Sequence, residues 1–161
     1  MILSHPELNM LRLGLGQYGV SPIEKYQEYH TPVLTWNSTI VQVKDLKKGD
    51  VVSYNGIFTA LEDMRIAVVP AGYYEGIPRS LSSIGSYKIH NQIAPILGRV
   101  CMNITVVDIT DIDGVCVGDS VEIISPEALS YNSIISHAQK AETIPYEIMT
   151  GLSESIRRVV K

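Results

Sequence analysis

Cysteine is scarce in this sequence, with Cys101 and Cys116 the only two in 161 residues. They do not form a Cys-x-x-Cys pair, and the four histidines show no His-x-x-x-His spacing, so the usual signature of a zinc site is missing. Both thiols stand in or beside apolar runs, which predicts two buried free cysteines. This pattern excludes a disulfide-rich secreted scaffold and favours a reducing compartment, the cytoplasm.

Clusters of positive charge and long apolar runs are also lacking. The chain has 13 Lys and Arg against 17 Asp and Glu, a net charge of −4 and no run of basic residues. Nucleic acid is therefore not expected as a partner, since phosphate binding needs a clustered positive face. No apolar run approaches the roughly 18 residues of a membrane span, and the N-terminus has no signal-peptide pattern. No membrane contact is expected either.

What the chain does have is apolar material, 45% of its residues, which is enough for the core of one ordinary domain. From Val33 onward, Val, Ile and Thr are concentrated in short runs. Turn signals separate these runs about every 8 to 15 residues, which favours a β-barrel or sandwich over alternating strands and helices. The run from Ile66 to Ala71 predicts an interior strand buried on both faces, ended by Pro70.

The two ends of the chain differ from this β-rich centre. Leucines alternate with Arg and Gly over residues 11–16, which predicts a short strand that runs into a turn. Near the C-terminus, Asn132 or Ser133 can cap a helix. Pro145 and Gly151 are placed to begin and end a second helix.

A β-hairpin is predicted in the stretch GDVVSYNGIFTA. Two apolar-rich runs, 51–54 and 57–60, flank Asn55-Gly56, the strongest short-range signal for a two-residue type I′ turn. Tyr54 then lies at the tip of the hairpin. It is either an aromatic side chain that packs near a turn or a phenol placed for a reaction.

Four further residues stand out. Tyr73 opens the glycine-flanked loop GYYEGIPR, Met102 and Asn103 lie in GRVCMN, and Tyr146 stands at the predicted start of a helix. Each has an ordinary structural explanation, because tyrosines at element ends are commonly half-buried and methionine fills cores. No single one of them indicates an enzyme.

Six segments taken in order are more specific. They are NMLRLGLGQYG, GDVVSYNGIFTA, IAVVPAGYYEGIPRSLS, PILGRVCMNITVVDIT, VGDSVEII and TIPYEIMTGLSESIRRVV, and they span Asn9 to Val160. In this order they resemble the C-terminal β domain of the alanine racemase family. The resemblance implies that residues 33–161 form a mainly β domain, a β-barrel or Greek key with short helices near the C-terminus. Residues 1–22 would then be a remnant of the last strand of the family's N-terminal (β/α)₈ barrel, and residues 23–32 a linker.

The family uses pyridoxal phosphate, bound to a lysine of the barrel, to interconvert L-alanine and D-alanine, a precursor of peptidoglycan. The resemblance implies an isomerase that acts as a homodimer, in which the C-terminal domain of one subunit completes the site for the amino-acid substrate in the other. Tyr54 matches the tyrosine that works opposite the lysine, and racemisation needs an acid–base group on each face of Cα. Around it, Tyr73 matches a tyrosine at the entrance and Met102 a residue whose backbone N–H holds the substrate carboxylate. Asn103 stands where the family usually has aspartate.

The resemblance also implies ligands for the cofactor. Arg12 matches an arginine that faces the pyridine nitrogen and keeps it unprotonated, because a second cation would be repelled. Gly14 and Leu15 match backbone ligands of the phosphate, and Tyr146 matches a tyrosine whose hydroxyl bonds it. No metal ligand is implied.

No stretch of the sequence resembles the family's cofactor-lysine motif. We therefore expect the chain not to racemise alanine unaided, not to bind the cofactor covalently, and to need an N-terminal barrel domain in the same or a separate chain. Three explanations stay open: part of a full racemase, half of a split racemase for another amino acid, or a non-catalytic β-barrel binding module. Residues 1 to about 20 are expected to be disordered or paired with a neighbour's sheet edge.

Overall fold

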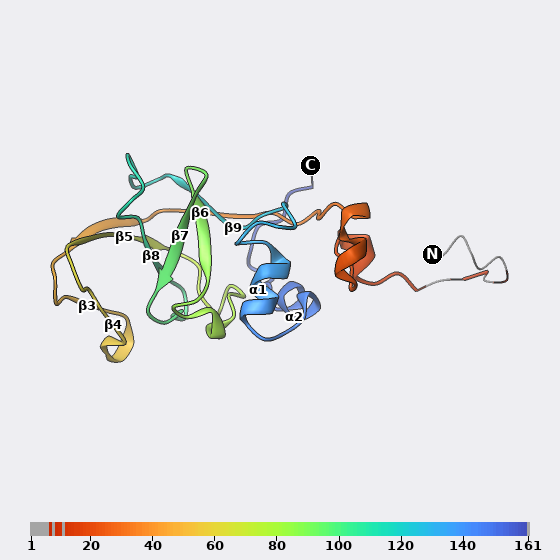
Figure 1. The fold of residues 1–161 in the computed structure, drawn as a ribbon, viewed down its shortest axis with the longest axis horizontal. Helices are drawn as coiled ribbons and strands as arrows, with labels where there is room; N and C mark the ends of the chain where they lie inside the picture. The colour runs from red at the N-terminus through yellow and green to blue at the C-terminus, as the bar shows by residue number, and fades with distance from the viewer. Residues whose placement is uncertain (1–6, 8, 11, 161) are drawn as a thin grey trace.

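The computed structural model describes residues 7, 9, 10 and 12–160, and its main body is a curled antiparallel β-sheet (Figure 1). Seven strands follow the order β1-β9-β6-β7-β8-β5-β2, and β3 and β4 form a separate hairpin. The mainly β architecture predicted from the sequence is confirmed. The strands are β1 (Trp36–Thr39), β2 (Gln42–Leu46), β3 (Val51–Val52), β4 (Phe58–Thr59), β5 (Met64–Val69), β6 (Ser86–Ile89), β7 (Gln92–Leu97), β8 (Thr105–Asp108) and β9 (Ser120–Ile124).

Strand β7 turns the sheet. Its residues 92–95 pair with β6, whereas residues 96 and 97 pair with β8, so one strand serves both halves of the sheet and the sheet bends along it. Strand β5 lies between β8 and β2, with Ala67 and Val69 fully buried and Val68 half-buried. This confirms the predicted interior strand.

Two short helices, α1 (Ile134–Lys140) and α2 (Pro145–Thr150), follow the sheet. Ser133 caps α1, since its Oγ accepts the N–H of Ser136 at 3.1 Å, and Pro145 occupies the start of α2 with Gly151 at its end. Both predicted helices are thus confirmed. The described residues also form the 3₁₀ helices η2 (Leu15–Tyr18), η3 (Glu24–Tyr29), η4 (Tyr54–Gly56) and η5 (Arg79–Leu81). In this part of the chain no helix has the length and apolar character needed to cross a membrane.

Two apolar clusters hold the fold together. The larger fills the inside of the curled sheet and extends to Ile134 of α1 and Ile148 of α2. The smaller lies beneath the hairpin and consists of Leu46, Val52, Ala60, Ile66 and Leu97. The hairpin therefore rests on a small core of its own.

The strand predicted near the N-terminus is wrong in the described part of the chain. Residues 12–14 have no regular structure, and Leu15 begins η2. Gly19, with a φ of 72°, then reverses the chain where a side chain would clash with the backbone of the following segment. Leu15 and Val20 are buried in the larger cluster, so the expected disorder is wrong for this stretch. Residues 7, 9 and 10 are exposed and lie in no strand, and the rest of that prediction falls on residues 1–6, 8 and 11, which lie outside the described residues.

The two cysteines are free, but neither is fully buried. Cys101 is half-buried, whereas Cys116 is exposed and its thiol donates to Asp119 Oδ1 at 3.2 Å. The prediction of two buried thiols is therefore wrong, most clearly for Cys116. Across the described residues, no group of three or more His, Cys, Asp or Glu side chains is arranged to hold a metal ion.

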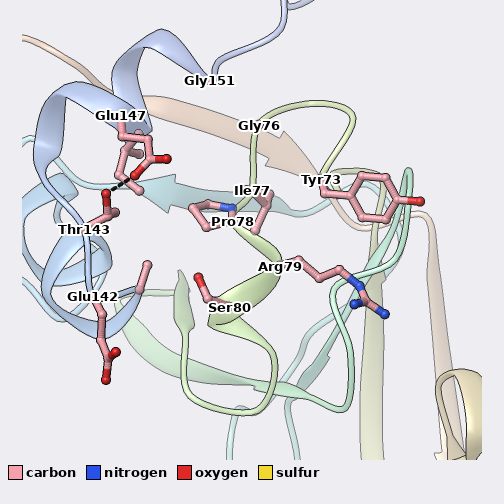
Figure 2. A pocket seen from close by; sticks show the side chains of 12 residues that line it. Tyr73, Gly76, Ile77, Pro78, Arg79, Ser80, Glu142, Thr143, Glu147 and Gly151 are labelled. Atoms are coloured by element: carbon pink, nitrogen blue, oxygen red, sulfur yellow. Dashed lines mark hydrogen bonds between the residues drawn. The ribbon is translucent and has the colours of Figure 1, made fainter.

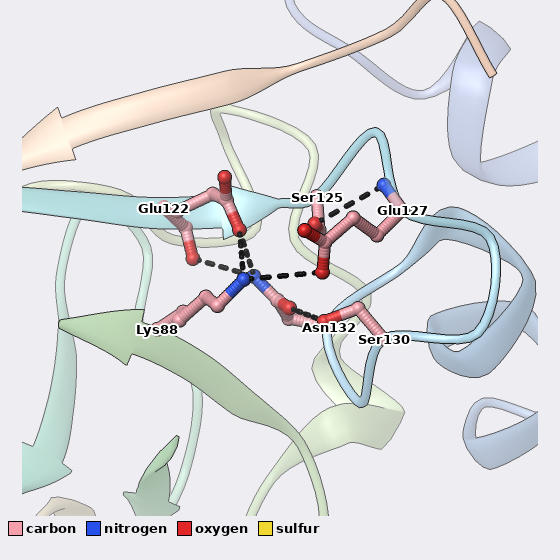
Figure 3. A network of polar contacts seen from close by, with 6 residues as sticks. All are labelled: Lys88, Glu122, Ser125, Glu127, Ser130 and Asn132. Carbon is pink, nitrogen blue, oxygen red and sulfur yellow. Dashed lines mark hydrogen bonds and ion pairs between the residues drawn. The ribbon is translucent and has the colours of Figure 1, made fainter. Parts of the chain in front are cut away.

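A polar network fixes the connection between β9 and α1 (Figure 3). Lys88 of β6 lies 3.7 Å from Glu122 of β9 and 3.3 Å from Glu127. Asn132 donates to the backbone oxygen of Glu122 at 2.9 Å and accepts from Ser130 at 2.6 Å. The network ties two strands to the turn that leads into α1, and so holds the helices against the sheet.

Candidate active site

Tyr54 stands on the predicted hairpin, but the turn differs from the predicted one. Strands β3 and β4 pair antiparallel, which confirms the hairpin. The loop between them comprises residues 53–57 and contains η4 in place of a two-residue type I′ turn. The Tyr54 side chain is 72% exposed, so this loop directs the phenol outward, away from the domain's own core.

Ser53 explains the altered turn beside Tyr54, and no sequence pattern singles it out. Its backbone has a φ of 73°, a conformation that is strained for any residue but glycine. Its Oγ accepts the N–H of Arg99 at 2.9 Å. Ser53 also packs closely on the neighbouring Gly98, because a Cβ on Gly98 would lie 2.7 Å from the Ser53 Cβ. The partners are 46 residues apart in sequence, so no local pattern could indicate the bond.

The loop after β5 places Tyr73 beside Met102. A side chain on Gly72 would clash with the carbonyl oxygens of Cys101 and Met102, so the two backbones approach as only glycine allows. The N–H of Tyr73 donates to Cys101 O at 3.0 Å, and that of Tyr74 to Met102 O at 2.9 Å. Two predicted site residues from distant parts of the sequence thus stand on adjoining backbones.

Tyr54 and Tyr73 line one cavity of about 420 Å³. Arg79, Arg99, Val100 and Cys101 complete its lining. The Nε of Arg99 is buried and has no hydrogen-bond partner within the described chain. Two phenols and two guanidinium groups therefore line the same space.

Tyr73 also borders a second cavity, of about 400 Å³, on the side of the helices. Figure 2 shows the Tyr73 ring and the Arg79 side chain projecting away from Thr143 and Glu147, which are hydrogen-bonded to each other on the far side. Gly76, in the same loop as Tyr73, packs so closely on the end of α2 that a Cβ there would lie 2.5 Å from the Gly151 oxygen. The loop is thus held between the Tyr54 cavity and the helices.

Tyr146 forms a separate cluster with the N-terminal segment. It lies in the first turn of α2 and is 37% exposed. A side chain on Gly14 would clash with the Tyr146 hydroxyl, so glycine is required where the two segments meet. Leu15 is buried next to it, whereas Arg12 is exposed. Neither Gly14 nor Tyr146 lines the cavity of Tyr54, so the predicted residues fall into two groups.

Asn103 contacts an acidic residue that the sequence analysis also missed. Its Nδ2 donates to Glu75 Oε1 at 2.9 Å, while Glu75 Oε2 accepts the N–H of Gly72 at 2.8 Å. The second bond joins residues three apart in the sequence, and a local turn contact of this kind can be suggested by sequence. The first joins residues 28 apart and depends on the fold.

The sequence matches the family described as "Alanine racemase, C-terminal domain" over residues 33–160. Among curated relatives, the alanine racemase of Halothermothrix orenii is 38% identical over 156 residues, covering 96% of this chain and 41% of that protein. The alanine racemase of Leptospira interrogans is 34% identical over 170 residues, covering 99% of this chain and 44% of that protein. The chain thus spans about two fifths of the length of these relatives.

Solved structures agree with the sequence relatives. The alanine racemase of Bartonella henselae, with covalently bound pyridoxal phosphate, superposes with a TM-score of 0.84 at 29% identity and covers 91% of this chain and 40% of its own. The alanine racemase of E. faecalis gives a TM-score of 0.82, also at 29% identity, over 94% of this chain and 42% of its own. The chain belongs to the alanine racemase C-terminal domain family.

Proposed function

We propose that this chain supplies the C-terminal part of the active site of a pyridoxal-phosphate-dependent alanine racemase, with Tyr54 as an acid–base group. The proposal depends chiefly on one observation: the Tyr54 phenol is 72% exposed on a loop that Ser53 fastens to the body of the domain. A phenol sequestered in the domain's own interior could not serve a reaction centre completed by another part of the enzyme.

Racemisation explains why such a phenol is needed. The Cα proton must leave from one face and return to the other, so a site with a single acid–base group would return the starting enantiomer. A phenol in water has a pKa of about 10, and a tyrosine acts as a base near neutral pH only where nearby cations favour its phenolate. Arg79 and Arg99 line the cavity that Tyr54 shares.

The cluster of Gly14 and Tyr146 fits the phosphate end of the cofactor. The glycine backbone passes so close to the Tyr146 hydroxyl that no side chain is allowed between them, so the Gly14 backbone and this phenol lie side by side. Gly14, Leu15 and Tyr146 would hold the phosphate, and Arg12 the pyridine nitrogen. When bound, pyridoxal phosphate withdraws electrons from Cα and so makes its proton easier to remove.

The separation of the two groups of residues supports a dimeric enzyme. The Tyr54 cavity and the Tyr146 cluster share no lining residue, as expected if each group serves a different active site. A second subunit would then bring its own Tyr54 to the cofactor held beside Tyr146. The barrel domain with the cofactor lysine would come from the same or a separate chain.

The test is a chimaera in which this chain replaces the matching segment of the H. orenii enzyme. We expect it to form D-alanine from L-alanine with added pyridoxal phosphate. In the Y54F variant, exchange of the Cα proton of L-alanine with D₂O should fall at least about 100-fold, because a positioned acid–base group contributes that much or more. Exchange from D-alanine, which would depend on the barrel lysine, should fall less.

Tyr131 provides the matched control. It is exposed by 65% on the connection between β9 and α1, so Y131F should leave both exchange rates unchanged. A Y54F variant that retains the exchange of L-alanine would contradict the proposal.

Adding this chain to a separately expressed barrel domain distinguishes a split enzyme from part of a continuous one. A split enzyme should be active in that mixture.

A further inference from the structure

We propose that Glu75 is a positioning residue of this site, whose carboxylate joins the loop of Tyr73 to the loop of Met102, with Asn103 as its partner. The inference rests on the proposed function and adds to it a residue that need not touch the substrate. It also gives a reason for asparagine at position 103, where the resemblance to the family leads one to expect aspartate.

Each oxygen of the Glu75 carboxylate has its own donor. Oε2 accepts the backbone N–H of Gly72 at 2.8 Å, and Oε1 accepts from Asn103 Nδ2 at 2.9 Å. Glu75 is half-buried, and no Lys, Arg or His forms an ion pair with it among the described residues. The charge is therefore stabilised by two neutral donors, and hydrogen bonds to an ionised acceptor are stronger than neutral ones.

The contact lies where the two loops meet. The N–H groups of Tyr73 and Tyr74 already bond the carbonyl oxygens of Cys101 and Met102 at 3.0 and 2.9 Å. Glu75 adds a side-chain bond across the same seam. Its own backbone oxygen accepts the N–H of Ser153 at 3.2 Å, which ties it to the segment after α2. Glu75 is thus well placed to fix the distance between Tyr73 and the backbone of Met102.

An amide suits position 103 for a direct electrostatic reason. A carboxylate there would face the Glu75 carboxylate at hydrogen-bond distance, and two like charges at that separation cannot both be ionised without repulsion. Asn103 offers two N–H donors and no charge. Glu75 and Asn103 are therefore a complementary pair, and changing either one should loosen the seam.

Amide hydrogen exchange on the chain itself tests the bridge independently of any activity. In E75A, the Gly72 N–H should exchange about 10-fold faster, because a bond to a charged group is lost. E75Q should restore slow exchange, since a glutamine oxygen can accept from Gly72 while its amide donates to the Asn103 oxygen. N103D, which repels the Glu75 carboxylate but leaves it as an acceptor for Gly72, should exchange faster than the unmodified chain and more slowly than E75A at neutral pH. E127A, which removes an exposed glutamate of the network in Figure 3, is the matched control and should leave Gly72 unchanged.

The chimaera described above tests the positioning role. E75A should raise KM for alanine about 3- to 10-fold with kcat changed less than about twofold, because Tyr73 and the Met102 backbone would act in substrate binding and Tyr54 is untouched. E75Q should recover most of the loss in KM. Unchanged exchange of Gly72 in E75A, or faster exchange with an unaltered KM, would overturn the inference. An inactive unmodified chimaera would reject the proposed function, whereas the exchange rates would still decide whether Glu75 joins the two loops.

Discussion

Tyr54 and Tyr146 are fixed in the fold by different means. Tyr54 stands on a loop between two strands of two residues each, above the smaller apolar cluster. Tyr146 stands on α2, whose Ile148 is buried in the larger cluster that fills the sheet. The proposed acid–base group thus rests on the weaker part of the structure and the proposed phosphate ligand on the stronger part.

The two tyrosines differ in the interactions that fix their positions. The Tyr54 loop depends on long-range contacts of the Ser53 hydroxyl, chiefly with the backbone of Arg99, and on a strained backbone. The place of Tyr146 depends on apolar packing, which is spread over many side chains. Polar substitutions near Tyr54 should therefore disturb the site without unfolding the domain, whereas Tyr146 should move only when the whole domain is destabilised.

The largest effect on stability is expected in the larger apolar cluster, on which Tyr146 depends. I148A removes a side chain that is 2% exposed and should lower the free energy of unfolding by about 3 to 4 kcal/mol, through lost burial and the cavity left behind. V52A, in the cluster beneath the hairpin, is the matched control and should cost about 1 to 2 kcal/mol. Urea denaturation measures both. If both variants lost the same free energy of unfolding, the smaller cluster would stabilise the domain as much as the larger one, which contradicts this prediction.

The same division explains what the sequence could predict. Ser133 and Pro145 act on their own helix ends, and both helices are where the local signals place them. The hairpin was predictable from its two apolar runs, but its turn was not, because Ser53 is held by a residue 46 positions away. Leu15 fits an alternating strand pattern, yet it packs into the domain's own core beside a chain reversal.

The candidate site shows the same limit. The resemblance to the family pointed to Tyr54 and Tyr73 as members of one site, and the fold makes them line one cavity. Arg79 and Arg99, which also line it, carry no local signal that separates them from surface arginines. The bond from Asn103 to Glu75 has no local signal either, because it exists only after the loops following β5 and β7 meet.

Acid should destabilise the region of α1 and α2 before the rest of the domain. His137 of α1 is 1% exposed, with Nε2 3.3 Å from Ser86 O, and burial lowers its pKa from about 6.5 to about 4, with a smaller contribution from Lys140. Above pH 6.5 both folded and unfolded states hold a neutral imidazole. As pH falls from 6.5 toward 4, the unfolded state binds a proton that the folded state does not, so stability declines by up to roughly 3 kcal/mol.

Urea denaturation at pH 7 and pH 4.5 checks this expectation. Carboxyl groups also begin to titrate at the lower pH, so the informative quantity is the difference between the unmodified chain and H137Q. The variant should lose clearly less stability between the two pH values, because glutamine does not titrate. Between pH 7 and pH 4.5, the protection of backbone amides, taken relative to their intrinsic exchange rates at each pH, should fall more in α1 and α2 than in β3 and β4. A variant with the same pH dependence as the unmodified chain would rule out His137 as the cause.

The smallest effect on stability, and the most informative one for the site, is expected at Ser53. S53A loses the bond to Arg99 and keeps a β-carbon at a φ of 73°, so it should lower the free energy of unfolding by about 1 to 2 kcal/mol. S53G also loses the hydroxyl but relieves the backbone strain, and should cost less. In the chimaera, both should lower kcat about 10-fold, because the hydroxyl, and not the strain, holds the phenol in place. If kcat instead followed stability, falling in S53A but not in S53G, backbone conformation and not the Ser53–Arg99 bond would set the position of Tyr54.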